Sequence, residues 1–263
     1  MIYSGRVDSR PVFQRKGYFM NEFFSTVSQW FESTWADISE QFYMNFIKAD
    51  RWKFLWEGLG ITLKITILAA VFGIIIGIII GMVTFTHNKT GKLKFLNGVF
   101  QVYLTIVRGT PVLVQLLIIY FVVFASVDVD KTLVAIIAFS INSGAYVAEI
   151  IRGGIQSVKE GQFEAGRSLG FSYIKTMWYI VIPQALRNII PMLLNEFITL
   201  LKETSICGYI ALNDLTRGAY IIQSRTFSPF MPLIAIALIY LVLVLLLTLL
   251  VKYIERRLSK NAR

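Results

Sequence analysis

The sequence predicts an all-α integral membrane protein with about five transmembrane helices. Of its 263 residues, 56% are hydrophobic and 16% are charged, and the mean hydropathy is +0.62. Soluble domains carry roughly 45–50% apolar and about 25% charged residues. The apolar residues also gather in long runs, with the basic residues between them. Lipid offers no partners for unpaired backbone groups, so such runs are expected to cross a bilayer as helices.

The charged and metal-ligating residues exclude several functional classes. The net charge of +10 does not indicate nucleic-acid binding, because membrane proteins hold Lys and Arg in their cytoplasmic loops. The single cysteine, Cys207, excludes an internal disulfide and a multi-thiolate metal site. With one histidine, His87, a histidine-ligated zinc site is equally unexpected. We therefore expect no catalytic residue and no metal site.

The first apolar run, Leu59 to Phe85, exceeds the roughly 20 residues that a helix needs to cross a bilayer. It carries Gly73, Gly77 and Gly81, a small residue at every fourth position. Such a stripe lets a second helix approach closely, so we expect it to lie at a helix–helix contact. The alternative is a helix that merely tolerates glycine while facing lipid.

The second apolar run, Phe95 to Phe124, is too long for one straight span. Proline disfavours helical geometry in the residue before it, so the break is expected at Arg108-Gly-Thr-Pro111. An interfacial or partly buried helix would end near Val107, and a second span would begin near Pro111. The other expected spans are the third, fourth and fifth: about Lys131 to Ile151, about Ile189 to Leu201 with an extension at each end, and Pro229 to Val251.

The distribution of basic residues predicts the orientation. With five spans, three basic segments fall on one side, which is then the cytoplasm. The N-terminus is expected outside and the C-terminus inside. The segments follow the first, third and fifth spans and contain Lys89, Lys92 and Lys94; Arg152, Lys159, Arg167, Lys175 and Arg187; and Lys252, Arg256, Arg257, Lys260 and Arg263.

Residues 1–54 are expected to form an N-terminal extension, and residues 55–263 the transmembrane domain. Within the extension, residues from about 22 to 47 show apolar side chains at helical spacing with acidic residues between them. This pattern predicts an amphipathic helix lying on the outer membrane surface. Arg6, Arg10, Arg15 and Lys16 oppose the charge rule, which suggests that Met20 is the native start and residues 1–19 are upstream sequence.

The most informative motif lies in a basic loop at about residues 160–183. Glu164-Ala165-Gly166 is followed after three residues by Gly170, and after nine more by Ile180 to Ile182-Pro183. This spacing resembles the signature loop of ABC-importer permeases, with Gly166 and Ile182 as conservative departures. The resemblance implies a short coupling helix that docks on an ATPase subunit, where Gly170 can end the helix in a left-handed conformation. The alternative is an ordinary solvated helix–turn–helix loop.

Three further stretches are similar to the polar amino-acid subfamily of these permeases, the histidine/glutamine/arginine type. The resemblance covers about Leu55 to the C-terminus and implies a binding-protein-dependent type I importer fold in a bacterial plasma (inner) membrane. It implies two permease copies (identical or paralogous), two ATPase subunits that bind ATP and Mg, and an external amino-acid-binding protein. No phosphate-binding loop with a G-x-x-x-x-G-K-[ST] pattern occurs in this chain. The stretches are Arg108 to Leu116, Gly144 to Ser157 and Leu201 to Ile206.

Polar residues inside the spans are candidates for amino-acid binding, because ionisable groups there usually face the bundle interior or an aqueous cavity. Glu196 is suited to an ammonium group, with Asn195 and Thr199 as hydrogen-bonding neighbours. Asn142 and Ser143 are candidates to line the path. The alternative for all five is hydrogen bonding between helices, for instance a clamp from Glu196 to Arg152 or Lys202.

A last group is expected to be a gate or structural. Arg108 precedes the break, and Glu149 and Arg152 share one helix face. Lys202 and Glu203 stand at the outer end of the fourth span, as a gate, a docking surface or a solvated ion pair. Other functional classes are an importer for cystine or another small polar solute, a stand-alone channel or secondary transporter, and a membrane enzyme. The few buried ionisable residues disfavour the enzyme, and five spans do not divide into repeated halves.

Overall fold

The structure is a computed structural model that describes residues 12–260, with side chains from 25 to 258. All regular secondary structure in this range is helical. The chain divides into two units, residues 1–51 and 52–263, which are described separately. The division lies three residues before the boundary expected from the sequence.

The first unit is built on α1, Val12–Phe42, which begins ten residues before the expected helix. A π-helical turn at Tyr43–Ile47 and a 3-10 turn at Lys48–Asp50 follow it. The helical path ends where Ala49 and Asp50 take positive φ values of 58° and 53°. On α1, large apolar side chains are exposed at spacings of three and four residues: Val27, Trp30, Phe31, Trp35, Ile38 and Phe42.

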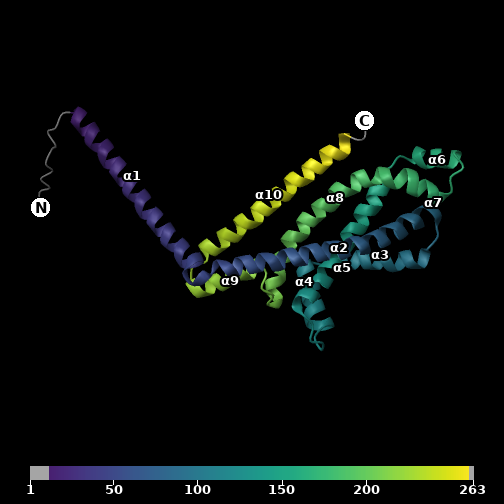
Figure 1. Cartoon of the computed structure of the whole chain (residues 1–263), viewed down its shortest axis with the longest axis horizontal. Helices are drawn as coiled ribbons and strands as arrows, with labels where there is room; N and C mark the ends of the chain where they lie inside the picture. Colours follow the sequence, from purple (N-terminus) through teal and green to yellow (C-terminus); the bar gives the residue numbers. More distant parts are fainter. Residues whose placement is uncertain (1–11, 261–263) are drawn as a thin grey trace, which may run out of the picture. The chain divides into compact units, whose positions relative to one another are not determined.

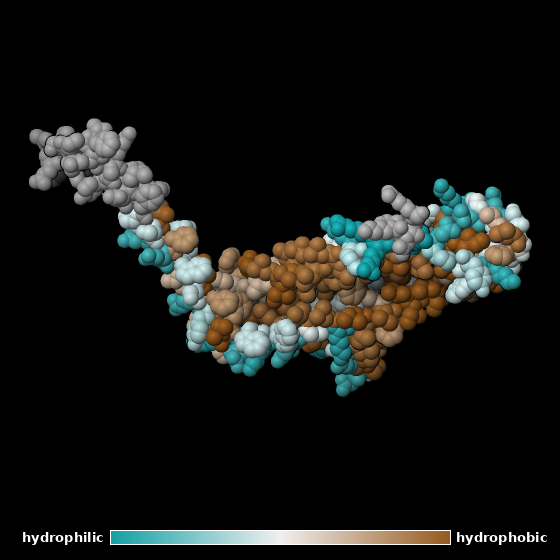
Figure 2. Space-filling view, turned by 45° about the horizontal axis from the view of Figure 1, so that its top comes forward, coloured by the Kyte–Doolittle hydropathy of each residue, from teal (hydrophilic) through white to brown (hydrophobic). Residues whose placement is uncertain are grey.

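The second unit contains four helices that are long and apolar enough to cross a membrane, or five spans if one bent pair also crosses. This agrees with the expected count of about five. Figure 2 shows hydrophobic surface along the middle of this unit and hydrophilic surface toward its ends. The four are α2 (Trp52–Thr90), α5 (Lys131–Gln156), the continuous stretch Tyr173–Ile210, and α10 (Phe230–Lys260).

The glycine stripe of α2 packs directly against α5, as expected. A Cβ added to Gly77 would lie 2.4 Å from a Val147 methyl carbon and 2.9 Å from the Ala148 backbone nitrogen. At Gly81 it would lie 2.8 Å from the Ala148 carbonyl oxygen. Each glycine thus lets the two backbones approach to a distance that any side chain would prevent.

The bent pair consists of α3 (Lys94–Gly109) and α4 (Val112–Ile118), which continues as a π-helical turn, Ile119–Val123. The two parts meet at 109° (Figure 1). The bend lies at the expected motif, because Thr110 and Pro111 are both extended, with ψ of 145° and 136°. Proline disfavours helical geometry in the residue before it and has no backbone N–H to donate.

The expected fourth span is much longer than residues 189–201. A short helix α7 (Tyr173–Thr176), a π-helical turn (Met177–Val181), α8 (Ile182–Glu203) and a 3-10 turn (Thr204–Ile210) form one continuous stretch. Pro183 lies in the first turn of α8, directly after the π-helical turn. Its missing N–H therefore falls where the regular hydrogen-bond ladder is already interrupted.

One helix was not expected. Residues Leu215–Thr226 form α9, which lies between the expected fourth and fifth spans. Asp214 begins this helix by accepting from the backbone N–H groups of Thr216 and Arg217, at 3.2 and 3.0 Å. The search for apolar runs did not reveal α9, because this helix is amphipathic, short and polar.

The basic segments gather at one end of the second unit. Lys89 at the end of α2 forms a 2.5 Å ion pair with Glu160 of α6 (Glu160–Ser168). An open groove of about 690 Å³ brings Ser157 and Arg187 together with Glu255 near the end of α10. At the opposite end, Gly218 of α9 lies against the backbone of Phe54 in α2. The C-terminal ends of α2, α5 and α10 therefore lie on the same side of this unit, as the distribution of basic residues predicts.

Candidate functional site

The helix that carries the Glu-Ala-Gly motif, α6, ends in a Schellman motif. The backbone N–H of Phe171 donates to the Gly166 carbonyl at 3.0 Å, and that of Gly170 donates to the Arg167 carbonyl at 2.9 Å. Gly170 has φ of +75°, the left-handed conformation expected for it. This conformation turns the chain directly into α7 and fixes the length of α6.

The two faces of α6 differ. Phe163 and Gly166 are buried, and Phe163 stacks on Phe85 of α2 with ring centroids 6.3 Å apart. A Cβ added to Gly166 would lie 2.5 Å from a Thr176 side-chain carbon, so this glycine seats α6 on α7. Glu164 and Ala165 are exposed on the other side, and Pro183 is exposed at the start of α8. The motif therefore builds a short helix fixed on one face and free on the other.

A second set of predicted residues meets in the interior of the second unit. The Ser143 hydroxyl of α5 donates to the Glu196 carboxylate of α8 at 3.1 Å. Both residues line a cavity of about 240 Å³ whose remaining walls are apolar side chains from α2, α5 and α8: Ala70, Ile74, Val147, Ile190, Leu193, Leu194 and Phe197. A carboxylate in such a cavity can hold a cationic group, because little else there competes for it.

Asn142 does not join this cavity. Asn142 is buried, and its side-chain N–H group donates to the side-chain carbonyl oxygen of Gln115 in α4 at 3.0 Å. Gln115 donates in turn to the backbone carbonyls of Val107 and Thr110, at 2.7 and 3.0 Å. Gln115 was not singled out from the sequence, although it lies in the motif that begins at Arg108. Asn142 thus supports the bend between α3 and α4.

The side chains of Asn195 and Thr199 do not line the cavity that contains Glu196. Both are exposed on α8, where Asn195 donates to the Pro191 carbonyl at 2.9 Å and Thr199 donates to the Asn195 carbonyl at 3.2 Å. Asn195 lines the open groove that reaches Glu255 of α10. Of the five residues expected to bind substrate, only Ser143 and Glu196 lie together in the structure of this chain.

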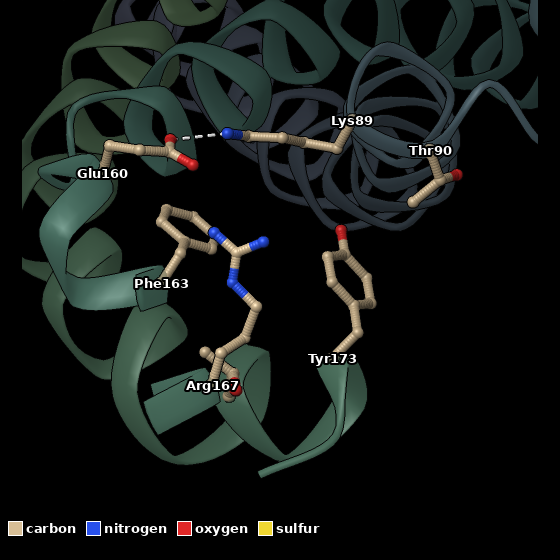
Figure 3. Close-up of a pocket in the computed structure, with 7 residues that line it drawn as sticks. Lys89, Thr90, Glu160, Phe163, Arg167 and Tyr173 are labelled. Atoms are coloured by element: carbon tan, nitrogen blue, oxygen red, sulfur yellow. Dashed lines mark hydrogen bonds and ion pairs between the residues drawn. The ribbon is translucent and has the colours of Figure 1, made fainter. Parts of the chain in front are cut away.

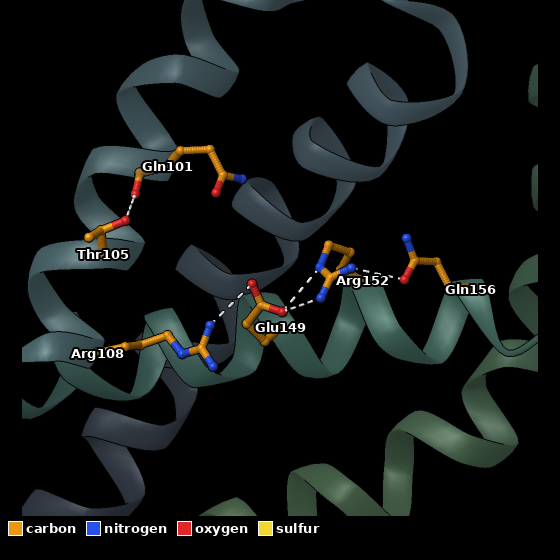
Figure 4. A network of polar contacts seen from close by, with 6 residues as sticks. All are labelled: Gln101, Thr105, Arg108, Glu149, Arg152 and Gln156. Atoms are coloured by element: carbon orange, nitrogen blue, oxygen red, sulfur yellow. Dashed lines mark hydrogen bonds and ion pairs between the residues drawn. The ribbon is translucent and has the colours of Figure 1, made fainter.

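The Glu149 carboxylate lies between two guanidinium groups (Figure 4). Arg152, one turn further along α5, pairs with it at 2.5 Å, and Arg108 from the end of α3 approaches at 3.4 Å. Arg152 also donates to Gln156 at 2.9 Å. The network joins α3 to α5, and Arg152 is therefore not the partner of Glu196.

Lys202 and Glu203 are neighbours at the end of α8, with Lys202 exposed and Glu203 half-buried. No ion pair joins them in the part of the chain with described side chains. Cys207 follows in the 3-10 turn and is fully buried in the core around α2 and α5.

Asp214 is a site that the sequence did not reveal. It is fully buried, yet it accepts the hydrogen bonds that begin α9. Burial raises the pKa of its carboxyl from 3.8 to about 6, against the opposing effect of the hydrogen bonds from Arg217 and Thr216. By contrast, Asp130 before α5 is solvated, and hydrogen bonds from Thr132 and Leu133 lower its pKa.

Residues 73–260 match a family described as binding-protein-dependent transport system inner membrane components. The arginine transport system permease protein ArtQ of Bacillus subtilis is 42% identical over 161 residues, which cover 60% of this chain and 74% of that protein. The L-cystine transport system permease protein TcyB of the same organism is 42% identical over 174 residues, 65% and 74% of the two chains. A putative glutamine transport system permease protein GlnP of Rickettsia prowazekii is 38% identical over 175 residues, 66% and 80%.

Two solved structures have the same fold. One, described as an amino acid ABC transporter with histidines, has a TM-score of 0.73 and 43% identity over 81% of this chain and 98% of the other. The MetNI methionine ABC transporter in an inward-facing conformation has a TM-score of 0.70 at 19% identity, over 80% and 98%. The chain therefore belongs to the binding-protein-dependent transport system inner membrane components, as a multi-pass permease subunit that is not itself an ATPase.

Proposed function

We propose that this chain is the membrane-spanning permease subunit of an ATP-driven amino-acid importer, and that α6 is its contact with the ATPase. The observation that carries the proposal is the two-faced geometry of α6, with Phe163 and Gly166 seated on the bundle and Glu164 and Ala165 exposed. The relatives named for arginine, cystine and glutamine transport support an amino acid as cargo.

The coupling runs along a continuous helical path. The ATPase subunits bind ATP and Mg, and their closure draws the α6 helices of two permease copies together. Because Gly166 seats α6 on Thr176, a displacement of α6 moves the stretch that begins at Tyr173 and carries Glu196. Rocking of this stretch against α5 opens the central cavity to the outside and then to the inside.

A second permease copy, identical or paralogous, covers the exposed face of α8. Only 22% of the most apolar part of Tyr173–Ile210 is buried within this chain. The surface left exposed nevertheless carries two polar side chains, Asn195 and Thr199. Polar side chains in a span face protein or water more often than lipid. The second copy and the translocation path therefore lie against this face.

The amino acid is held by its ammonium group, and the Glu196 carboxylate supplies the opposite charge. The Ser143 hydroxyl fixes this Glu196 carboxylate by donating to it. Arginine, glutamine and cystine share this group, so Glu196 serves cystine import equally and does not select among them. Asn142 acts through Gln115 on the bend. Arg108, Glu149 and Arg152 hold α3 against α5, and Lys202 and Glu203 lie near the surface where an external binding protein delivers its ligand.

The first unit lies on the outer membrane surface. Its helix α1 exposes Trp30, Phe31 and Trp35 by 64%, 64% and 67% on one side, while Glu32 and Glu40 are also exposed. Tryptophan and phenylalanine at the interface bury their rings at the level of the lipid headgroups.

The test is ATP-driven amino-acid uptake in proteoliposomes that contain the full chain, its ATPase and its binding protein. Gly166→Val places a branched side chain whose Cβ would lie 2.5 Å from Thr176, whereas the Cβ of Gly161→Val in the same helix meets no atom within 4 Å. We expect Gly166→Val to lose uptake by at least about tenfold, the effect of roughly 1.4 kcal/mol, and Gly161→Val to retain it.

The ATPase content of the purified complex is the second measurement. Equal uptake by the two variants would contradict the role of α6. Absence of ATP-stimulated amino-acid uptake in the unaltered complex would contradict the importer itself.

A further inference from the structure

A cavity of about 290 Å³ lies beside α6, at the end of the unit that holds the basic segments. Figure 3 shows its side chains converging from the end of α2, from α6 and from the start of α7. It lies apart from the cavity of Ser143 and Glu196, and the proposed transport cycle does not use it. Its lining residues are Lys89, Thr90, Glu160, Phe163, Arg167, Tyr173 and Thr176.

The charges around this cavity leave a surplus of one positive group. Lys89 is paired with Glu160 at 2.5 Å, and its ammonium lies 5.0 Å from the centre of the Phe163 ring. Arg167 points from α6 toward the same space (Figure 3). Among the residues with described side chains, no carboxylate forms an ion pair with Arg167. The cavity therefore presents an uncompensated guanidinium beside a neutralised lysine.

A buried hydroxyl gives a second, independent observation. Thr176 is 2% exposed, and its hydroxyl oxygen has no hydrogen-bond partner in the described structure although the residue lines the cavity. A buried hydroxyl without a partner lowers stability, so a ligand that accepts its hydrogen bond is favoured there. The Tyr173 hydroxyl points toward the end of α2 across the cavity (Figure 3), where its partner is the Thr86 side chain. The Arg167 guanidinium and the Thr176 hydroxyl are therefore the donors that the cavity offers to an oxyanion.

We propose that this cavity binds a phosphate group, held by the Arg167 guanidinium with a hydrogen bond from the Thr176 hydroxyl. A planar guanidinium matches the tetrahedral phosphate by donating two parallel N–H groups. The volume of about 290 Å³ accommodates a phosphate with its immediate substituents. The single surplus charge suits a phosphodiester monoanion.

Two sources supply this chemistry, the headgroup of an anionic phospholipid and free phosphate. Basic pockets between membrane helices on the cytoplasmic side commonly hold lipid headgroups. Next to the cavity, Ile174 and Trp178 are exposed by 77% and 67%, an apolar surface suited to an acyl chain. A bound phosphate would tie the end of α2 to α6 and α7, so its effect on transport rests on the proposed coupling role of α6.

The binding test uses the full chain purified with its ATPase in two arms. In the first, nanodiscs contain phosphatidylcholine with phosphatidylglycerol, and native mass spectrometry measures the phosphatidylglycerol retained. In the second, nanodiscs contain phosphatidylcholine alone, and inorganic phosphate is titrated while thermal unfolding is followed. Retention in the first arm assigns the phosphate to lipid, and stabilisation in the second assigns it to the free ion.

In the arm that shows binding, Arg167→Gln is expected to reduce affinity by about tenfold or more, since it removes the charge and the paired N–H donors that hold the phosphate. Lys175→Gln is the matched control, because Lys175 is exposed on α7 and does not line the cavity. Thr176→Val keeps the shape of the side chain and removes only its hydroxyl. It is expected to weaken binding while the protein still folds.

Several results would overturn the proposal. The first is that neither phosphatidylglycerol nor inorganic phosphate binds. The second is that Arg167→Gln binds as tightly as the unaltered chain, and the third is that Thr176→Val does so. Loss of the ATPase from Arg167→Gln with full retention of phosphatidylglycerol would assign Arg167 to the ATPase contact instead. Because binding is measured without transport, these outcomes are separate from the uptake experiment that tests the importer.

Discussion

Adjacent residues on one helix have different surroundings in this protein. Glu196 faces α5 and its cavity, while Asn195 faces the groove toward α10. Successive helical residues point about 100° apart, so the sequence could predict that the two diverge. It could not predict which one faces the interior, because that depends on how α8 is rotated against α5. The same limit concealed the role of Gln115, whose partner Asn142 is 27 residues away.

Asp214 gives a prediction at this scale. Its pKa rises from 3.8 to about 6 on folding, so the folded state disfavours the ionised carboxyl. The contribution of this carboxyl to stability is then greatest below about pH 4 and is lost as the pH rises through about 6, by up to roughly 3 kcal/mol. We expect Asp214→Asn to remove this loss, because the neutral amide oxygen still accepts an N–H from α9.

Thermal unfolding of the purified complex between about pH 4 and pH 7 measures this difference. Asp214→Ala is the comparison, since it removes both the charge and the cap and should be less stable at every pH. Identical pH profiles for Asp214→Asn and the unaltered protein would show that the carboxyl is not responsible.

At the scale of the helices, the residue pattern predicted the contacts between helices better than it predicted the lengths of the helices. The glycine stripe of α2 identified a close contact because only missing side chains allow such an approach, and α5 meets it at Val147 and Ala148. The bend at Pro111 followed from proline chemistry. The extent of Tyr173–Ile210 and the existence of α9 could not be predicted, since π-helical turns and packing against α2 override local apolarity.

The contact between α2 and α5 predicts the effect of a single methyl group. Gly77→Ala places a carbon 2.4 Å from Val147, which must force the helices apart and lower stability by about 1–3 kcal/mol. Gly60→Ala in the same helix meets no atom within 4 Å and should be neutral or stabilising by up to about 1 kcal/mol. Melting temperatures of the two variants in detergent test this, and equal melting would refute the contact.

At the scale of the molecule, the basic segments gather at one end because α2, α5 and α10 all finish there. Charge counting could predict this side without any coordinates. It could not decide whether α3 and α4 cross the membrane, because their 109° bend fits either a broken span or a re-entrant loop. With four spans the two chain ends would share a side, and with five they are opposite.

Cysteine labelling on intact bacteria decides the orientation. The native Cys207 is buried and is replaced by serine, after which single cysteines are placed at the exposed positions Lys92, Asn213 and Ser39. We expect an impermeant maleimide to label Asn213→Cys and Ser39→Cys from outside, and Lys92→Cys only after permeabilisation. Labelling of Ser39→Cys only after permeabilisation would place α1 inside and reduce the count to four spans.

The uneven burial of the spans also orders how the protein is made. The apolar middle of α10 is only 11% buried in the protein, so lipid alone suffices to accept this helix. The middle of α5 is less apolar and is 72% buried, and the buried polar residues Ser140, Asn142 and Ser143 lie along this helix. We therefore expect newly synthesised α5 to enter the bilayer more readily when α2 is already beside it, since the glycine stripe of α2 is the surface that covers α5 in the folded protein.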